Sequence, residues 1–152
     1  MKVGIVAVGR LKEKYFADAV AEYAKRLGAY CEFRVTEVTP APPAKSPSEQ
    51  SEEEGRALIG KARGYVIALD GGGREVSSKG LADIIAAECG RGQSEFSFLI
   101  GGSHGLSREV LERADVVLSF GKPTYPHQLF RVMLAEQIYR AFTINAGTPY
   151  HK

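Results

Sequence analysis

Cysteine is scarce in this chain, with only Cys31 and Cys89 among 152 residues. Neither cysteine belongs to a CxxC pair or stands at zinc-site spacing from a histidine, so no metal site is predicted. Isolated thiols without a pairing pattern are typical of proteins from a reducing compartment. We therefore expect a cytoplasmic protein that holds no metal.

Long apolar runs and an excess of charge of one sign are also missing. No run approaches the roughly 20 apolar residues of a membrane-spanning helix, and the opening MKVGIVAVG is too short and too weakly charged for a signal peptide. Lys and Arg number 20 against 18 Asp and Glu, a net charge of +2. No membrane association is predicted, and the whole chain has no strong basic field for nucleic acid.

The usual glycine signatures of nucleotide sites are absent as well. Neither DGGGREV nor IGGSHGL has the G-x-G-x-x-G spacing of a dinucleotide site, and no P-loop GK[ST] string occurs. Gly102 and Gly105 have the GxxG spacing of an RNA-binding KH loop, but they follow a predicted strand instead of joining two helices. These signatures therefore do not identify a ligand.

Apolar runs and helical patterns alternate along the chain. Strands are predicted at 2–9, 33–38, 65–70, 96–102 and 116–120, and helices at 13–28, 51–63, 81–89, 107–114 and 127–144. This alternation predicts one α/β domain over residues 1–152, with a mainly parallel sheet and helices on both faces. The alternating strand at 33–38 is expected near an edge. Ser51-x-x-Glu54 predicts a helix start, and proline-rich residues 40–50 predict a loop with no assigned role.

Three loops are expected beyond the carboxyl ends of strands, where ligands bind in sheets of this kind. They are residues 70–73, 101–106 and 120–126, which are rich in glycine or proline and poor in charge. Leu69, Ile100, Phe120 and Tyr125 border them. Backbone groups between apolar side chains suit a flat heteroaromatic ring such as adenine, although ordinary connecting loops would have the same composition.

The string Gly101-x-Ser103-x-Gly105 has the spelling of a hydrolase nucleophile elbow. Asp115 and His127 follow it in the order that such hydrolases use. However, Asp115 is expected at the amino end of its strand, about 16 Å from the serine end at roughly 3.3 Å per residue. A serine hydrolase using Ser103 is therefore kept as an alternative function.

The stretch from Pro123 to Phe142 is the richest in functional side chains. His127 and Arg131 are i,i+4 neighbours on the last predicted helix, beside the third loop. His127 is either a base or substrate contact or an ordinary helix-start residue. Arg131 either grips phosphate or carboxylate or lies on a solvated face. The pair Glu136 and Arg140 is interpreted as structural, and the ending TPYHK in isolation as a frayed tail.

The strings LIGGSHGLS, YPHQLFRVMLAEQIYRAF, PYHK and MKVGIVAVG together resemble the bacterial ribosomal RNA large-subunit methyltransferase H family of the SPOUT superfamily. The resemblance runs from Met1 to Lys152, with residues 40–63 matched only by pattern. It implies an α/β fold with a deep trefoil knot near the C-terminus. It also implies bound S-adenosylmethionine, a homodimer whose active site is completed across the subunit interface, and methylation of pseudouridine N3 in large-subunit ribosomal RNA on the assembled ribosome.

The resemblance also assigns residues. Those implied at the cofactor are Leu69, Gly101, Phe120, Gly121, Lys122, Pro123, Thr124 and Tyr125. Ser103 is then part of the pocket wall and not a nucleophile. A base or cation near N3 would assist the transfer, and His127, Arg131 and His151 are the candidates, His151 from either subunit. RNA contacts are expected from Arg131, Arg140 and Lys152. A non-catalytic module that binds RNA or the ribosome is the other alternative.

Overall fold

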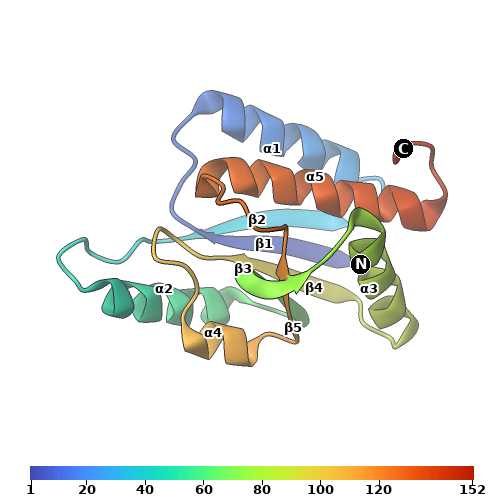
Figure 1. The fold of residues 1–152 in the computed structure, drawn as a ribbon. Helices are drawn as coiled ribbons and strands as arrows, with labels where there is room; N and C mark the ends of the chain where they lie inside the picture. The colour runs from blue at the N-terminus through green and yellow to red at the C-terminus, as the bar shows by residue number, and fades with distance from the viewer.

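Strands and helices alternate strictly in the computed structural model, which describes residues 1–152 (Figure 1). The strands are β1 Lys2–Val8, β2 Glu32–Val38, β3 Tyr65–Glu75, β4 Glu95–Ile100 and β5 Val116–Ser119. The helices are α1 Lys14–Leu27, α2 Pro47–Lys61, α3 Ser78–Gly90, α4 Arg108–Arg113 and α5 His127–Ala146. The predicted order of strands and helices is therefore confirmed.

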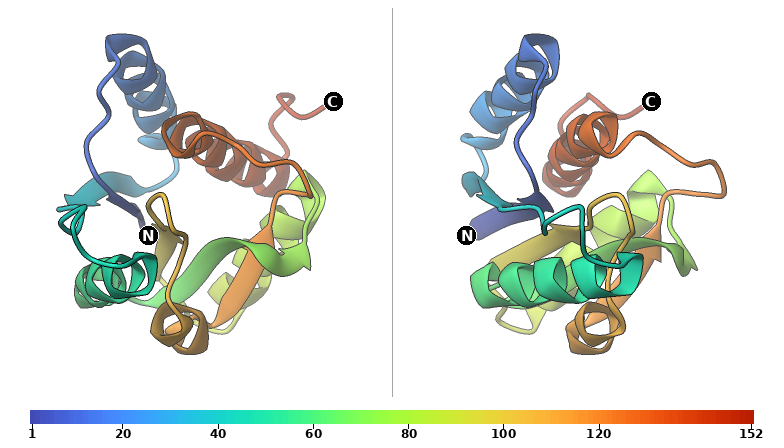
Figure 2. Two further views of the ribbon diagram at one scale, coloured as in Figure 1. Left: turned by 60° about the vertical axis from the view of Figure 1, so that its left-hand side comes forward. Right: turned by 90° about the vertical axis from the view of Figure 1, so that its left-hand side faces the viewer.

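The strands form a single five-stranded sheet in the order β2-β1-β4-β3-β5, and all four pairings are parallel. The predicted α/β fold with a parallel sheet is confirmed, as is the edge position of β2. Helices α1 and α5 cover one face and α2 and α4 the other (Figure 2). Helix α3 joins the first layer, because its buried residues share one core with α1 and α5.

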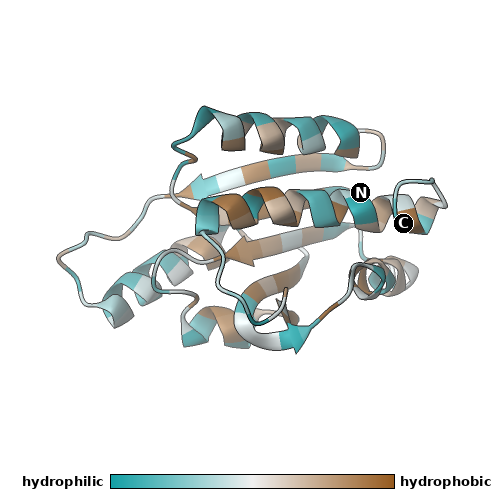
Figure 3. Ribbon diagram, turned by 45° about the horizontal axis from the view of Figure 1, so that its top comes forward, coloured by the Kyte–Doolittle hydropathy of each residue, from teal (hydrophilic) through white to brown (hydrophobic).

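Alternation along each strand divides the core between the two faces. On β1, Ile5 and Ala7 face the core under α1, α3 and α5, whereas Val6 and Val8 face the core under α2 and α4. Apolar residues are concentrated in the central strands and along α5, while the outer face of α1 is hydrophilic (Figure 3). None of the helices combines the length and the apolar character needed to cross a membrane. The knot implied by the resemblance stays a prediction.

Helix α2 begins earlier than predicted. Its N-cap is Ser46, whose hydroxyl accepts a hydrogen bond from the Glu49 N–H at 3.2 Å, and Pro47 occupies the first turn. Ser46-x-x-Glu49 is thus the capping box, and proline at the start favours the same boundary. The predicted start at Ser51-x-x-Glu54 is wrong: both residues lie inside α2, on its buried face.

Strand β3 extends past the predicted turn at 71–73. The strand continues to Glu75 and pairs again with β5 after a register shift between Leu69 and Arg74. At Gly73 a Cβ atom would lie 2.8 Å from the carbonyl carbon of Leu118, so only glycine allows β3 to pass β5 this closely. The glycines therefore form an irregular stretch of the strand.

Candidate active site

A cavity of about 640 Å³ opens beyond the carboxyl ends of β4 and β5, beside the irregular stretch of β3 that begins at Leu69. Its volume lies within the range of small-molecule sites, roughly 300–1,000 Å³. The three segments predicted as loops all contribute to its wall, although residues 70–73 belong to β3. The eight residues that the resemblance assigns to a cofactor all line it, namely Leu69, Gly101, Phe120, Gly121, Lys122, Pro123, Thr124 and Tyr125.

The loop after β4 makes its part of the wall from backbone. Gly102 and Gly105 form a bridge in which the Gly105 N–H donates to the Gly102 carbonyl at 3.0 Å. A Cβ atom on Gly101 would lie 2.6 Å from the carbonyl carbon of Gly105, and Gly105 has a φ of +74°. Both positions therefore require glycine, and the turn presents main chain to the cavity.

Helix α2 supports this glycine loop from behind. The Ser51 hydroxyl donates to the Gly105 carbonyl at 3.4 Å. The Glu54 carboxylate accepts the Ala41 N–H at 2.9 Å through Oε2, while Oε1 is buried without a partner and would lie 2.8 Å from a Cβ on Gly102. Glu54 therefore lies between the proline-rich segment and the glycine loop. The sequence pattern does not reveal this role, because Ser51-x-x-Glu54 also has the spacing of a helix cap.

The loop after β5 is held by its own contacts. The Ser119 hydroxyl accepts the Gly121 N–H at 3.2 Å, and the Tyr125 hydroxyl donates to the Phe120 carbonyl at 3.3 Å. The rings of Phe120 and Tyr125 lie 5.1 and 5.8 Å from the ring of Phe130, between centroids. Phe130, on α5, also lines the cavity, and the sequence analysis did not identify it. Aromatic rings and backbone groups thus alternate along this wall.

Few charged groups reach the cavity. Lys122 and Asp70 line it, and Asp70 Oδ2 accepts the Gly72 N–H at 2.9 Å. His127 is the first residue of α5, and its exposed side chain also borders the cavity. The expected combination of backbone groups and little fixed charge is therefore present, together with the Asp70 carboxylate.

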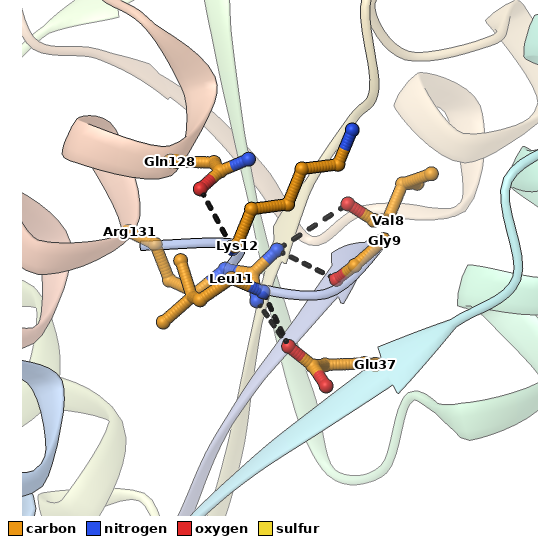
Figure 4. A network of polar contacts seen from close by, with 7 residues as sticks. All are labelled: Val8, Gly9, Leu11, Lys12, Glu37, Gln128 and Arg131. Carbon is orange, nitrogen blue, oxygen red and sulfur yellow. Dashed lines mark hydrogen bonds and ion pairs between the residues drawn. The ribbon is translucent and has the colours of Figure 1, made fainter. Parts of the chain in front are cut away.

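Arg131 is buried away from the cavity, with 1% of its side chain exposed (Figure 4). Its Nη1 lies 2.6 Å from Glu37 Oε2, and its Nη2 donates to the carbonyls of Gly9 at 3.0 Å and Val8 at 3.3 Å. Burial lowers the pKa of the guanidinium, against the effect of Glu37. The expectation that Arg131 grips phosphate does not fit this geometry, since Glu37 already occupies the guanidinium.

His151 lies near the other end of α5. Its Nδ1 is 3.1 Å from Nη1 of Arg140, whose Nε donates to Glu136 Oε1 at 2.6 Å. Arg140 stands thirteen residues after His127 on the helix, a rise of about 20 Å at 1.5 Å per residue. The two candidate imidazoles, His127 and His151, are therefore far apart within one chain.

The catalytic triad of a hydrolase is not assembled. Asp115 pairs with the start of β3: its N–H donates to the Val66 carbonyl at 2.8 Å, and its Oδ2 accepts the Val66 N–H at 2.7 Å. This fixes Asp115 at the amino end of the sheet, as the hydrolase argument anticipated. The Ser103 hydroxyl lines the cavity but makes no hydrogen bond to a histidine or a carboxylate. The geometry therefore does not favour the serine hydrolase alternative.

Comparisons with known proteins agree with this architecture. The family described as "Predicted SPOUT methyltransferase" matches residues 1–151. Proteins named "Ribosomal RNA large subunit methyltransferase H" from Carboxydothermus hydrogenoformans and Ligilactobacillus salivarius are 51% and 50% identical over 159 aligned positions, covering 100% of both chains.

Solved structures share the fold at low sequence identity. A probable methylase family protein from Haemophilus influenzae superposes with a TM-score of 0.54 at 14% identity, over 99% of this chain and 70% of the other. TrmJ from Z. mobilis gives 0.53 at 14% identity, over 100% and 73%.

Proposed function

The chain belongs to the SPOUT methyltransferase family, and on that premise we propose that it methylates large-subunit ribosomal RNA with S-adenosylmethionine as methyl donor. The proposed acceptor is N3 of a pseudouridine on the assembled ribosome, in the cytoplasm. The cavity at the carboxyl edge of the sheet, lined by all three glycine- and proline-bearing segments, carries the proposal. Identity of 51% over the full chain to a relative named for this activity supports it.

The cavity suits the proposed cofactor. Leu69, Ile100 and Phe120 offer apolar surface for the adenine ring, and the glycine loop offers backbone donors and acceptors at its edge. The Asp70 carboxylate can accept hydrogen bonds from hydroxyl groups or an ammonium. When bound, S-adenosylmethionine supplies an electrophilic methyl group on a sulfonium. A site with few fixed charges leaves that positive sulfur as a dominant charge within the cavity.

His127 is the proposed proton acceptor. Methyl transfer requires the acceptor nitrogen to be aligned with the methyl carbon, and N3 must also lose its proton. An imidazole at the mouth of the cavity can take that proton or favour the N3 anion. His127 has this position, at the exposed start of α5 beside the third loop.

Arg131 and His151 are assigned different roles. We infer that Arg131 positions the start of α5, because its buried guanidinium contacts Glu37 and the carbonyls of Val8 and Gly9 and does not border the cavity. His151 lies about 20 Å along α5 from His127, so its proposed contribution to catalysis comes from the partner subunit of a homodimer. The interface then completes the active site.

Methyl transfer to ribosomes tests the function. Assembled ribosomes, separate large subunits and naked RNA, all lacking the modification, are incubated with radiolabelled S-adenosylmethionine, and the nucleosides are identified by mass. We expect methylpseudouridine with assembled ribosomes. Cofactor binding without transfer to any of them would point to another acceptor. Absence of both would refute the proposal.

His127→Ala tests the base, with His104→Ala as a matched control on the exposed glycine loop. We expect His127→Ala to lower kcat by about 100-fold or more while the Kd for the cofactor changes little. His104 does not border the cavity, and its replacement should leave kcat near wild type. Equal turnover of the two variants would remove His127 from the chemistry.

Complementation tests the shared active site. Co-expressed His127→Ala and His151→Ala chains form mixed dimers with one intact pair of histidines. Random pairing should therefore restore about a quarter of wild-type activity. The shared active site would be contradicted if the wild type sedimented as a monomer or if the mixed dimers recovered no activity.

A further inference from the structure

The segment Gly9–Tyr15, between β1 and the first turn of α1, carries exposed cations and an exposed ring. Arg10 and Lys12 are exposed and take part in no ion pair within 4.0 Å, whereas Lys14 is paired with Asp18 at 2.7 Å. Tyr15 is 65% exposed, the most of the exposed large hydrophobic side chains. Side chains of this kind are available to a partner that combines negative charge with flat rings.

The backbone of this segment is fixed at three points (Figure 4). Arg131 binds the Gly9 carbonyl at 3.0 Å, Glu37 Oε2 accepts the Leu11 N–H at 3.3 Å, and Gln128 Oε1 accepts the Lys12 N–H at 3.1 Å. Gln128 directly follows His127, which borders the cavity. The segment is therefore tied to the first turn of α5, whose first residue borders the cavity.

The nearby acids do little to cancel these cations. The Glu37 carboxylate is neutralised by buried Arg131 and Asp18 is occupied by Lys14, which leaves Glu13 as the free acid in the segment. Phosphates bind to such unpaired cations in a salt-dependent way. Exposed aromatic rings stack on unpaired bases, which every single-stranded region of RNA provides.

We propose that Gly9–Tyr15 is an RNA-docking surface that binds an unpaired stretch of the substrate RNA next to the target nucleotide. Arg10 and Lys12 contact its phosphates, and Tyr15 stacks on a base. This inference rests on the proposed function, and it assigns recognition to the N-terminal part of the chain as well as to the C-terminal cations. Arg131 then has a second effect, because it fixes this surface relative to His127.

Two sets of variants test the surface. The first is Arg10→Ala combined with Lys12→Ala, with Lys61→Ala as a control that removes another exposed, unpaired cation on the opposite face of the sheet. The second is Tyr15→Ala, with Tyr15→Phe as the control that keeps the ring. The measurements are KM and kcat for methyl transfer, Kd for ribosomes by co-sedimentation at several salt concentrations, cofactor Kd and Tm.

The double variant should raise KM and the ribosome Kd and flatten the log–log salt dependence by about 1.4, the value for two phosphate contacts to a single strand. Tyr15→Ala should weaken ribosome binding by roughly fivefold to a hundredfold, and Tyr15→Phe by less than twofold. Cofactor Kd and Tm should stay at wild-type values. Lys61→Ala should match the wild type throughout.

Unchanged ribosome binding in both sets would overturn the inference. A change of oligomeric state in Tyr15→Ala would overturn it too, because it would make this surface a contact between subunits. Failure of the proposed function gives a different result. In that case the wild type transfers no methyl group, and co-sedimentation still decides whether these side chains bind ribosomes. A wild type that does not sediment with ribosomes overturns the surface as well.

Discussion

Helix α5 carries two arginine–glutamate pairs of opposite kinds. Arg131 is buried and reaches Glu37, which lies 94 positions earlier in the chain, at 2.6 Å. Arg140 binds Glu136 on the same helix, also at 2.6 Å, and both side chains are partly exposed. The distances are equal, but the first pair ties α5 to the carboxyl ends of β1 and β2, and the second joins residues one turn apart.

The comparison shows that the effect of an ion pair depends on which parts of the chain it connects. When a local pair is broken, both partners can turn to water, because they lie on one helix surface. The buried Arg131 cannot turn to water in this way, so the loss of Glu37 leaves its charge without compensation. The first pair should therefore govern the geometry of the site, and the second should govern only the docking of the tail.

Glu37→Ala should have the largest effect. It leaves the Arg131 guanidinium buried with only the Val8 and Gly9 carbonyls as acceptors. Because Glu37 itself is 37% exposed, we expect the free energy of unfolding to fall by about 2–3 kcal/mol, less than for a fully buried pair. Urea unfolding measures this. Glu32→Ala on the same strand removes a pair with Arg34 whose side chains are 49% and 77% exposed, so about 1 kcal/mol or less is expected there. Equal losses of unfolding free energy in Glu37→Ala and Glu32→Ala would contradict the proposed difference between buried and exposed pairs.

Arg131→Lys should come next. A single ammonium cannot reproduce the planar guanidinium that bonds Glu37 and two carbonyls together, and we expect a loss of about 2 kcal/mol. The ribosome Kd should rise too, because the Gly9–Tyr15 segment loses its anchor. The matched change, Arg140→Lys, keeps an ion pair with Glu136 and should cost less than 1 kcal/mol. If Arg131→Lys behaves like Arg140→Lys, buried connectivity has no special value in this helix.

Arg140→Ala should have a smaller effect on stability. It removes the local pair with Glu136 and the contact of the guanidinium with the Tyr150 ring, 4.8 Å from the ring centroid, for a loss of about 1 kcal/mol. The tail should be released, since His151 also loses its contact with Arg140. Limited proteolysis should cut the tail faster, while Tm changes little. A tail that stays protected would show that Tyr150 packing alone holds it.

The smallest effect concerns the thiol of Cys31. Burial raises its pKa to about 11 from an ordinary value of 9.0. Between these values the folded chain binds more protons than the unfolded chain, so this group lowers stability as pH rises from 9 to 11. Alkylation at pH 9, read by peptide mass, should be slower in the native protein than in urea. The neighbouring Tyr30 contacts Thr148 of the tail through its hydroxyl, so release of the tail in Arg140→Ala should speed the alkylation slightly. Lys61→Ala should leave its rate unchanged.

The sequence predicted the sheet and the loops but not their supports. Strand and helix periods are local, and they correctly placed the loops after β4 and β5 at one edge of the sheet, whereas residues 70–73, predicted as a third loop, belong to β3. The partner of Arg131 could not be found in this way, because periodicity indicates a helix face and not which distant strand covers it. Glu54 was misread for a related reason. Ser51-x-x-Glu54 and Ser46-x-x-Glu49 both fit a capping box, and Pro47 was the signal that separates them.

The glycine loop after β4 also bears on how this protein can change over generations. Its wall is main chain, so the shape of the cavity there depends on where Gly101 and Gly105 fall and hardly on the exposed side chains of Ser103 and His104. Many substitutions at those two positions would leave the backbone groups in place. A one-residue insertion or deletion would shift them all. Ser103 and His104 should therefore vary freely, while the glycines and the length of the loop stay fixed.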